Sequence, residues 1–400
     1  MNKIAALLEY AKTNVPFHRR RAPLEYRVLE HWPLMGKEDL VAYSLDVSSD
    51  LLSEARERGG YIVASGGTTA KPKYLYYTYE EFLTVSRNVG RCMLRNGLEP
   101  GDGVVNYLSA GDMWSSFIMM DKALFGLPVT IYPLGYSPKM DSAAEVFACF
   151  KPNVVIGIPS MILNFARYTA EHHPRIRVQK VFYGGEPMPV ASKDLLASIW
   201  QCELVRSVGY ASTDAGSIGW QCPHCQPGEH YAFDDNVVEI VDDEIVTTPL
   251  FRKAMPVIRY RTGDRGQWVS PSCDCGQGAP MFKLLGRIDN VLLVWGCRIL
   301  HDAIVGVLGT LDIGCTAVQV RIQSRDGGQV LLVKFECLRP PQADVAGLLR
   351  DRFYEACEDI HGIVSREALD HDLFFESVPA DTLERNWRTG KAIPIIDARG

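Results

Sequence analysis

The stretch that decides the fold is Tyr61-Ile62-Val63-Ala64-Ser65-Gly66-Gly67-Thr68-Thr69-Ala70-Lys71-Pro72-Lys73. Its apolar start, residues 61–64, predicts a strand, and the remainder predicts a loop rich in glycine, hydroxyl and lysine side chains. Glycines let backbone N–H groups approach phosphate oxygens, hydroxyls add donors, and lysine adds positive charge. The loop therefore suits a nucleotide triphosphate, although it lacks the spacing of a Walker A loop. The alternative is a polar surface turn.

Around this loop, residues from about 60 to 250 alternate short strands with helices. The spacing predicts strands at 61–64, 103–108, 129–132 and 154–157 and helices at 80–96, 114–125 and 141–150. Such alternation predicts an α/β fold with a largely parallel sheet covered by helices. Ligands bind such sheets where strands end and loops begin.

The pattern changes after Gly286. Two apolar runs, 315–323 and 330–337, flank a hairpin turn at 326–328, residues 342–360 have helical spacing, and 373–378 predicts a last strand. We therefore expect two domains. The first, 1–288, is a large α/β domain, and the second, 289–400, is a small α+β domain.

Composition narrows the class of protein. The 400 residues are 47% hydrophobic and 22% charged, which excludes a disordered chain. Lys and Arg number 42 against 48 Asp and Glu, a net charge of −6, so no global positive field would attract nucleic acid or anionic lipid. No apolar run approaches the roughly 20 residues of a membrane span, and the first 21 residues lack a signal-peptide core. We expect a soluble, cytoplasmic protein with no membrane partner.

The chain has eleven cysteines, an odd number that argues against a secreted disulfide framework. Four of them form two close pairs, Cys222-Pro223-His224-Cys225, followed by His230, and Cys273-Asp274-Cys275. CxxC and CxC pairs present thiolates at zinc-chelating distance, so we expect a structural zinc held by four of five residues: Cys222, Cys225, His230, Cys273 and Cys275. A redox pair and simple buried thiols are the alternatives.

Five further segments follow the 65–73 loop in order. They are Tyr183-Gly184-Gly185-Glu186, Gly209-Tyr210-Ala211-Ser212-Thr213-Asp214, AMPVIRYRTGD at 254–264, Gly286-Arg287-Ile288-Asp289, and Arg388-Thr389-Gly390-Lys391. In this order they resemble the motifs of the adenylate-forming superfamily of acyl-CoA synthetases, luciferases and nonribosomal peptide adenylation domains. The 254–264 segment is similar to the form found in phenylacetate-CoA ligase-like members. The resemblance covers residues 61–391.

The resemblance implies an ATP site. ATP would be bound by Ser65, Gly66, Gly67, Thr68, Thr69, Lys73, Gly184, Gly185, Glu186, Tyr210, Ala211, Ser212, Thr213, Asp264 and Arg287. Within this set the loop residues and Lys73 would hold the phosphates, and Tyr210 would stack on adenine. Asp264 would accept the ribose hydroxyls, its alternative being a turn-forming aspartate. Asp214 would hold Mg²⁺, with the qualification that the family usually has the longer Glu there.

The resemblance also implies a mobile C-terminal domain. Asp289 stands at the position of the family's hinge, and Lys391 would neutralise the reacting carboxylate and bridging oxygen. Lys391, Thr213 and Asp214 are thus the expected catalytic residues. Among the zinc candidates, some related proteins pair one cysteine and a histidine with the later CxC, which would make Cys225 the spare. Related ligases also suggest a homodimer.

The acyl pocket is expected near Asp112, Tyr132, Gly135, Gly184 and Ala211. Asp112 stands where amino-acid-activating relatives pair the substrate ammonium; its alternative is to cap a helix starting at Met113. The substrate is accordingly an aryl acid or an amino acid. The acyl group would pass from adenylate to a thiol, that of CoA or a carrier protein. Transfer to an amine or protein side chain, and an inactive zinc-stabilised binding protein, are the alternatives.

Overall fold

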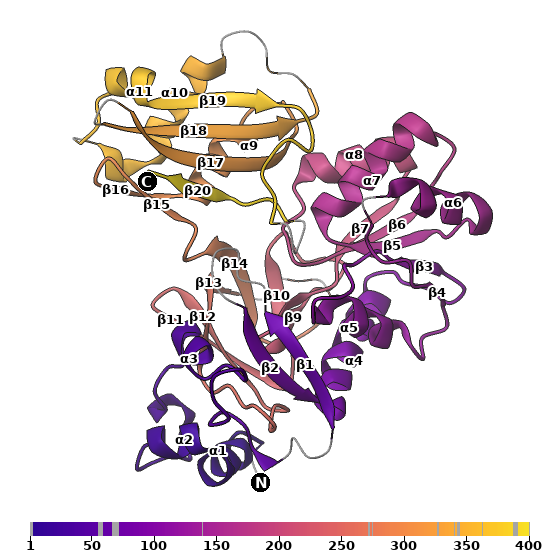
Figure 1. The fold of residues 1–400 in the computed structure, drawn as a ribbon, viewed down its shortest axis with the longest axis vertical. Helices are drawn as coiled ribbons and strands as arrows, with labels where there is room; N and C mark the ends of the chain where they lie inside the picture. Colours follow the sequence, from indigo (N-terminus) through magenta and orange to yellow (C-terminus); the bar gives the residue numbers. More distant parts are fainter. Residues whose placement is uncertain are drawn as a thin grey trace. The chain divides into compact units, whose positions relative to one another are not determined.

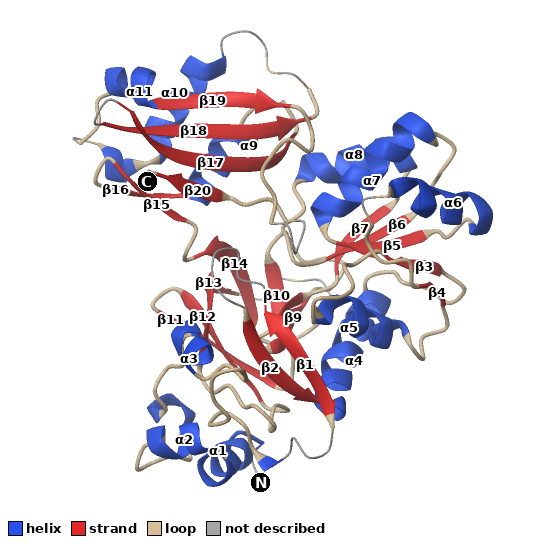
Figure 2. Ribbon diagram, in the orientation of Figure 1, coloured by secondary structure: helices blue, strands red, loops and turns tan. Residues whose placement is uncertain are grey.

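The computed structural model describes residues 3–54, 59–65, 72–137, 139–270, 273, 275–325, 328–339, 341, 345–361, 363–386 and 391–399. Its elements are drawn in Figure 1 and by type in Figure 2. Helices and strands alternate along the first half and strands dominate from residue 204 to 300. Among the described residues no helix is long and apolar enough to cross a membrane.

The chain divides into two compact units. The first unit consists of Met1–Ile158, Val178–Gly185 and Leu204–Arg287, and the second of Pro159–Arg177, Glu186–Glu203 and Ile288–Gly400. The second unit therefore joins the C-terminal part of the chain to α7 (Pro159–His172) and α8 (Val190–Trp200). The domain boundary expected between residues 288 and 289 stays a prediction. The second unit also includes two earlier segments of the chain, which a single boundary does not describe.

The first unit begins with short helices and a hairpin. The helices are α1 (Lys3–Asn14), α2 (Pro16–Arg21), η1 (Leu29–His31) and α3 (Lys37–Ala42), and the hairpin joins β1 (Gly60–Ser65) to β2 (Lys73–Thr78). The strand expected at 61–64 is thus present, but its partner is the antiparallel β2 rather than a strand of the parallel sheet. The reason is the short connection, since parallel pairing needs a crossover of a dozen or more residues.

Helix α4 (Tyr79–Arg95) follows β2 directly because its start is capped. The Thr78 hydroxyl accepts from the backbone N–H of Glu81, and the Glu81 carboxylate accepts from the backbone N–H of Thr78. This reciprocal pair satisfies two donors that a helix start leaves open. The helix buries its Phe82, Val85 and Val89 face against the rest of the unit.

A five-stranded parallel sheet confirms the expected α/β class. Its order is β4 (Thr130–Tyr132), β3 (Gly103–Asn106), β5 (Val154–Gly157), β6 (Lys180–Tyr183) and β7 (Leu204–Ser207), and all neighbours are parallel. Helices α5 (Ser115–Leu124) and α6 (Met140–Phe150) connect its first strands. The central β5 is buried along its whole length, as strands covered on both faces are.

The residues from 210 to 287 form a seven-stranded antiparallel sheet. Its order is β11 (Asn236–Val241), β12 (Glu244–Pro249), β13 (Tyr260–Val269), β14 (Met281–Arg287), β10 (Glu229–Ala232), β9 (Gly216–Trp220) and β8 (Tyr210–Ser212). The parallel pairing expected here is therefore limited to the earlier strands, because the connections here are short hairpins. Between β11 and β12 the two turn residues, Asp242 and Asp243, have φ values of 52° and 62°, as a two-residue hairpin turn requires.

The second unit contains a four-stranded mixed sheet. Its order is β19 (Leu373–Val378), β18 (Gly328–Cys337), β17 (Cys315–Arg325) and β20 (Ile395–Ala398). The central pair is antiparallel and both outer strands are parallel to their neighbours. The remaining elements are the hairpin of β15 (Val291–Val294) and β16 (Cys297–Leu300), α9 (His301–Gly309), α10 (Val345–Ala356), η3 (Glu358–Ile360) and α11 (Arg366–Asp372). The strands expected at 315–323, 330–337 and 373–378 are all present.

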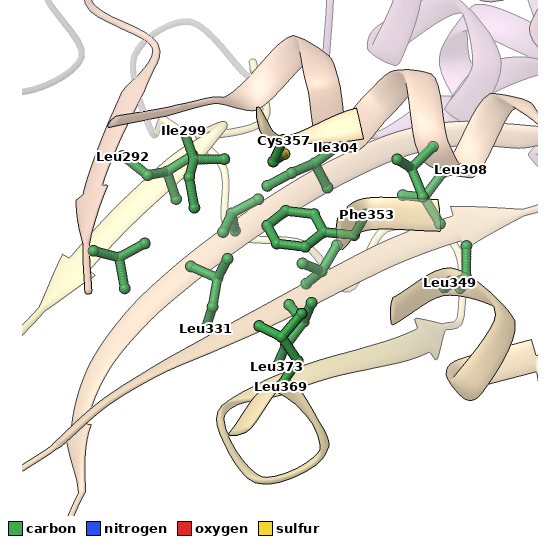
Figure 3. Packing of buried hydrophobic residues seen from close by; sticks show 14 of the residues in the cluster. Leu292, Ile299, Ile304, Leu308, Leu331, Leu349, Phe353, Cys357, Leu369 and Leu373 are labelled. Atoms are coloured by element: carbon green, nitrogen blue, oxygen red, sulfur yellow. The ribbon is translucent and has the colours of Figure 1, made fainter. Parts of the chain in front are cut away.

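The core of the second unit gathers apolar side chains from strands and helices (Figure 3). Ile304 and Leu308 of α9, Leu349 and Phe353 of α10 and Leu331 of β18 belong to one cluster, and all five are fully buried. Because such interiors are close-packed, removing atoms from one member leaves a cavity that its neighbours fill only in part.

We expect neighbouring leucines of α10 to respond differently to truncation. Leu349→Ala should lower the free energy of unfolding by about 2–5 kcal/mol because Leu349 has no exposed surface. Leu348→Ala should change it by less than about 0.5 kcal/mol, since Leu348 is 44% exposed. Urea denaturation followed by circular dichroism measures both. Equal losses in the two variants would contradict this packing.

Candidate active site

The turn after β8 brings the aromatic and ribose-side residues together. Tyr210 and Ser212 lie on β8 at one edge of the antiparallel sheet, and the Ser212 hydroxyl accepts from the backbone N–H of Ala215 (3.1 Å). The Tyr210 hydroxyl donates to Oδ2 of Asp264 on β13 (2.6 Å). Two residues expected to bind adenosine, 54 positions apart, are therefore in direct contact.

One oxygen of the Asp214 carboxylate is contacted by both a lysine ammonium and a tyrosine hydroxyl. Lys73 Nζ lies 2.6 Å from Oδ2, and the Tyr260 hydroxyl donates to the same oxygen at 2.5 Å. The side chains of Lys73 and Asp214 are 8% and 14% exposed, so water screens this pair weakly. Oδ1 is buried and has no hydrogen-bond partner among the described residues. A carboxylate oxygen in that position can accept a hard cation such as Mg²⁺.

Two further side chains hold the backbone of the turn. Arg252, which is fully buried, donates from Nη1 to the carbonyl oxygen of Asp214 (2.7 Å) and from Nη2 to that of Tyr76 (3.1 Å). The Tyr77 hydroxyl donates to the carbonyl oxygen of Thr213 (2.7 Å), and the Arg252 guanidinium lies 3.7 Å from the Tyr77 ring centroid. Carbonyl dipoles and the ring face thus compensate the buried charge. The backbone at 213–214 is held independently of the Asp214 side chain.

Asp264 is paired with Arg287 on the neighbouring strand. The two residues are opposite each other in the β13–β14 register, and Nη1 of Arg287 lies 3.3 Å from Oδ1 of Asp264. The same Nη1 donates to the carbonyl oxygen of Thr262 (3.2 Å). Gly263 has a φ of +77°, and a Cβ there would lie 2.8 Å from the guanidinium, so a glycine is needed beside it.

An aromatic cluster supports Tyr210. The His230 and Phe282 rings are stacked with centroids 5.8 Å apart, and they lie 5.9 Å and 6.1 Å from the Tyr210 ring. Burial lowers the pKa of His230 to about 4, so its neutral ring donates from Nδ1 to the Gly228 carbonyl oxygen (2.9 Å). Burial also raises the pKa of Tyr210, so its hydroxyl keeps the proton that it donates to Asp264.

The phosphate loop is described only at its two ends. Ser65 ends β1 and Lys73 begins β2, and the two residues are directly opposite in the hairpin. The Ser65 hydroxyl is buried without a hydrogen-bond partner in the described part of the chain. The other loop residues expected to bind phosphate lie outside the described residues: Gly66, Gly67, Thr68 and Thr69.

The adenine-side loop follows the end of β6. Gly184 donates its backbone N–H to the carbonyl oxygen of Gly157 (3.2 Å), and Gly185 has a φ of +82°. Glu186 falls in the second unit, where its Oε2 accepts from the backbone N–H of Ser160 (3.1 Å) in the first turn of α7. A carboxylate there satisfies a helix-start donor. The ATP-binding role of Glu186 stays a prediction.

The expected acyl-pocket residues do not form one cluster in the contacts of the described chain. Asp112 is exposed, and helix α5 begins at Ser115 with Trp114 as its N-cap, so the helix-capping alternative for Asp112 was wrong. The reason is the backbone, because Asp112 and Met113 have φ values of 47° and 61° and cannot start a right-handed helix. The Met113 carbonyl oxygen instead accepts from the backbone N–H of Ala64 beside the phosphate loop (2.9 Å).

The other pocket candidates are distributed along the parallel sheet and β8. The ring of Tyr132 lies 5.8 Å from that of Phe150. Gly135, with a φ of +70°, donates its backbone N–H to the carbonyl oxygen of Asn106 at the carboxyl end of β3 (2.9 Å). Ala211 is exposed on β8 beside Tyr210. Gly135 thus lies at the carboxyl end of a parallel strand, where ligands bind such sheets, and the pocket itself stays a prediction.

In the second unit, Lys391 lies in a segment whose backbone pairs with residues 384–386. Its carbonyl oxygen accepts from the Asn386 backbone N–H (2.8 Å), and the Ile393 N–H donates to the Glu384 carbonyl oxygen (2.9 Å). The Gln319 side chain, 3% exposed, joins both segments: Nε2 donates to the carbonyl oxygens of Glu384 (3.0 Å) and Ile393 (2.8 Å). A buried glutamine thus holds together the two paired segments, one of which carries Lys391.

The remaining motif residues of this region are only partly described. The other residues of the C-terminal motif, Arg388, Thr389 and Gly390, lie outside the described residues. Asp289, the expected hinge, lies in the short segment between the end of β14 and the start of β15. Neither the hinge role of Asp289 nor the catalytic role of Lys391 is tested by these contacts, and both stay predictions.

Four cysteines gather on one side of the antiparallel sheet. The Sγ atom of Cys222 lies 3.1 Å from that of Cys273 and 3.5 Å from that of Cys225, and the Sγ atoms of Cys273 and Cys275 are 3.2 Å apart. The sulfurs of Cys222, Cys273 and Cys275 all lie within 4.8 Å of one another, a spacing that a single metal ion could share. The donor set fits tetrahedral thiolate coordination of zinc.

The structure does not bring His230 into this cluster. Successive residues of a strand point to opposite faces, and Tyr231 of β10 takes the cysteine side, its hydroxyl lying 3.5 Å from Cys275 Sγ. His230 consequently faces Tyr210 and Phe282. The contacts therefore place Cys225 rather than His230 beside the other cysteines, and the residues that would bind zinc stay a prediction.

The sequence analysis missed three residues of the site: Tyr77, Arg252 and Tyr260. Each acts on the 213–214 turn from 38 to 136 positions away. For Tyr260 a signal existed, because the spacing from Tyr260 to Asp264 repeats that from Tyr210 to Asp214. No local pattern marks Tyr77 or Arg252.

The segment that leads into β13 is braced from the N-terminal part of the chain. The Glu81 carboxylate, which also caps α4, accepts from the backbone N–H groups of Lys253 (2.5 Å) and Ala254 (2.8 Å). His18 is buried in α2, and its Nε2 lies 2.9 Å from the carbonyl oxygen of Pro256. Burial lowers the pKa of His18 to about 4, so the neutral ring donates this hydrogen bond.

Comparison with known proteins agrees with this geometry. The family model described as "AMP-binding enzyme" matches residues 35–248. A phenylacetate-coenzyme A ligase of Thermus thermophilus is 22% identical over 391 residues, covering 92% of this chain and 87% of that protein. An indoleacetate–lysine synthetase of Pseudomonas savastanoi is 27% identical over 240 residues, covering 58% of this chain and 59% of that protein.

The fold also matches solved structures. A crystal structure of 2-hydroxyisobutyryl-CoA ligase in the postadenylation state aligns with a TM-score of 0.75 at 19% identity, covering 99% of this chain and 88% of that one. Since the family model covers more than half of the chain, the chain belongs to the AMP-binding enzyme family. It is an adenylate-forming acid ligase of the phenylacetate-CoA ligase-like branch, as the sequence motifs predicted.

We expect His18 to make stability depend on pH. The unfolded histidine has a pKa near 6.5 and the folded one about 4, so between these values only the unfolded chain binds the proton. The free energy of unfolding should therefore fall as pH drops from 6.5 to 4, by at most about 3 kcal/mol. His18→Gln keeps a donor for Pro256 but cannot titrate, so denaturation midpoints of this variant should fall less over that range. His172→Gln, at an exposed site, should follow the wild type; identical pH profiles for all three proteins would refute the assignment.

Proposed function

We propose that this chain uses ATP to activate a small carboxylic acid as an acyl-adenylate, releasing pyrophosphate, and then transfers the acyl group to the thiol of CoA. The observation that carries this proposal is the pairing of two carboxylates with two cations in one site, Asp214 with Lys73 and Asp264 with Arg287. Joining a carboxylate to a triphosphate brings two anions together, and the reaction needs positive charge held in place beforehand.

Each group has a role in binding ATP. Asp264 would accept the ribose hydroxyls, and the Tyr210 ring beside it offers a flat face for adenine. Lys73 at the end of the phosphate loop would neutralise phosphate oxygens. Asp214 would hold Mg²⁺, which when bound supplies Lewis-acid charge to the phosphates. Thr213, whose carbonyl is held by Tyr77, would direct its hydroxyl toward the same site.

Lys391 supplies a further positive charge in the second unit. In our proposal its ammonium neutralises the bridging oxygen and the incoming carboxylate during adenylation, and the backbone near Asp289 permits the second unit to move for the second step. Gln319 supports this role because it fixes the backbone of both paired segments. A fixed segment reduces the conformational freedom that a reaching lysine would otherwise lose.

Two acyl acceptors are considered, the thiol of CoA and an amine. Transfer to CoA is favoured by the relatives named phenylacetate-coenzyme A ligase, one of which covers 92% of this chain. Transfer to an amine is favoured by the indoleacetate–lysine synthetase, which at 27% has a higher identity over a shorter match. A carrier-protein thiol and a protein side chain remain alternatives from the sequence. Mass spectrometry of the product with CoA, lysine or a carrier protein added separately distinguishes these acceptors.

We propose that the substrate is an aryl acid or an amino acid. Asp112, which is exposed and lies near the phosphate strand, would suit the ammonium of an amino acid. An inactive binding protein is the remaining alternative. Against it stands the presence of Lys73, Asp264 and Lys391 in one chain, because a non-catalytic scaffold has no need of all three. The homodimer and the cytoplasmic location stay predictions.

Adenylation is tested by carboxylate-dependent exchange of pyrophosphate into ATP across a panel of aryl and amino acids. Lys391→Ala should lower the exchange rate by roughly 100-fold or more, because a charge placed at the reacting oxygens is removed. ATP binding should be retained. Lys334→Ala, which removes a lysine from β18 of the same unit, is the matched control and should exchange as the wild type does. No exchange with any acid together with no ATP binding would overturn the proposal.

We further propose that Cys222, Cys225, Cys273 and Cys275 hold a structural zinc. Support comes from the sulfurs of Cys222, Cys273 and Cys275, which all lie within 4.8 Å of one another, and from the Sγ atom of Cys225, 3.5 Å from that of Cys222. The four residues join the loop after β9 to the loop between β13 and β14. A metal there would tie these loops across β10, the strand that carries His230.

Zinc content is the test of this site. The purified wild type should contain about one zinc per chain by atomic emission, and Cys273→Ser should contain much less and unfold at lower temperature, since metal binding contributes to folding. Cys149→Ser, at an exposed cysteine outside the cluster, should keep the metal. A wild type that contains no zinc and whose melting temperature is insensitive to chelators would contradict this proposal.

A further inference from the structure

Two segments of the site have the same spacing of tyrosine and aspartate. Tyr210 on β8 and Asp214 in the turn after it are four positions apart, and Tyr260 and Asp264 are four positions apart on β13. Each tyrosine hydroxyl donates to the carboxylate of the other segment, Tyr210 to Asp264 (2.6 Å) and Tyr260 to Asp214 (2.5 Å). The hydrogen bonds therefore cross between the two segments.

Each carboxylate also has one cation. Lys73 contacts the same oxygen of Asp214 as Tyr260 does, whereas Arg287 contacts the other oxygen of Asp264 from the one that Tyr210 uses. Oδ1 of Asp214 thus remains buried and without a partner in the described residues. Such an oxygen costs free energy unless a ligand completes it.

Tyr260 is suited to orient the Asp214 side chain. Its own side chain is 2% exposed, and its backbone lies at the first position of β13, paired with β12, so the hydroxyl has little freedom. The hydroxyl donates to Oδ2 of Asp214 at 2.5 Å, which fixes the side of the carboxylate that it contacts. Lys73, by contrast, has a long flexible side chain and borders the phosphate loop.

The length of Asp214 makes an orienting partner necessary. Aspartate has one methylene fewer than the glutamate that related proteins usually carry, and its carboxylate rotates about a single side-chain bond beyond Cβ. A donor that fixes Oδ2 also fixes the direction of Oδ1. Arg252 and Tyr77 hold the backbone of the same turn, so the position of the carboxylate is determined from both ends.

We propose that Tyr260 is a positioning residue that presents Oδ1 of Asp214 to the Mg²⁺ of Mg-ATP, while Lys73 neutralises the same carboxylate before the nucleotide binds. This inference rests on the proposed ATP-dependent function. Tyr260 touches neither nucleotide nor substrate in this assignment; it acts through Asp214. Tyr210, its counterpart in the crossed pair, acts on Asp264 and therefore on the ribose side.

The experiment compares Tyr260→Phe with Tyr210→Phe, each of which removes one hydroxyl from one of the two crossed bonds. Calorimetric titrations of ATP without acid substrate, at several Mg²⁺ concentrations, and of AMP without metal measure binding directly. Tyr260→Phe should weaken ATP binding roughly 10-fold at limiting Mg²⁺, with the loss shrinking as Mg²⁺ rises, and should leave AMP binding unchanged. Tyr210→Phe should change ATP and AMP binding alike at every Mg²⁺ concentration.

Several outcomes would overturn the inference. If Tyr260→Phe keeps the wild-type Mg²⁺ dependence, or loses AMP and ATP equally, Tyr260 only supports the fold. Should Tyr260→Phe fail to fold, Asp214→Glu replaces it; this variant must alter the Mg²⁺ dependence of ATP binding without altering AMP binding, and no change overturns the inference. A wild type that binds AMP and ATP but whose ATP binding ignores Mg²⁺ refutes the inference alone. A wild type that binds neither nucleotide refutes the proposed function, and the inference with it.

Discussion

Two carboxylates withdrawn from water have to be kept charged, and most of the site follows from that constraint. Removing an ionised group from water costs several kcal/mol unless cations and hydrogen-bond donors replace the lost hydration. Asp214 receives Lys73 and Tyr260, and Asp264 receives Arg287 and Tyr210. The partners of Asp214 come from the two-stranded hairpin and from the seven-stranded sheet, so its environment requires both to be formed, whereas both partners of Asp264 lie in the seven-stranded sheet.

The N-terminal helices contribute to the same constraint from a distance. His18 of α2 binds the backbone that leads into β13, Met35 between η1 and α3 binds the backbone of Arg259 and Arg261, and Glu81 of α4 binds the same segment. The strand that carries Tyr260 and Asp264 consequently starts from a braced position. A small shift of this lead-in would displace both residues together, since they lie on one face of one strand.

The sequence predicted elements better than it predicted their partners. The strands and helices from 103 to 157 were confirmed within a few residues because alternation of short apolar runs is a local signal. The antiparallel sheet at 210–287 was not anticipated, since strand order depends on contacts between distant segments. The helix-capping alternative for Asp112 was wrong because Asp112 and Met113 themselves have left-handed backbone conformations, which residue type alone does not determine.

The site shows the same division between local and distant information. The motifs identified Lys73, Tyr210, Asp214, Asp264 and Arg287, and the structure brings these five together. They did not identify Arg252 or Tyr77, whose contacts span 38 and 136 positions. His230 was expected among the cysteines because the order of the motifs does not show which face of a strand a residue occupies. The sheet places His230 on the face of β10 opposite to the cysteines.

Because His230 and Tyr231 face opposite sides of β10, an insertion or deletion in this strand would affect both sides of the sheet. Glu229–Ala232 is a four-residue strand whose Tyr231 lies with the four cysteines while its His230 supports Tyr210. Inserting or deleting one codon here would exchange the two faces and remove both side chains from their neighbours at once. Because His230 and Tyr231 are both buried, the length of this strand is constrained together with its side chains.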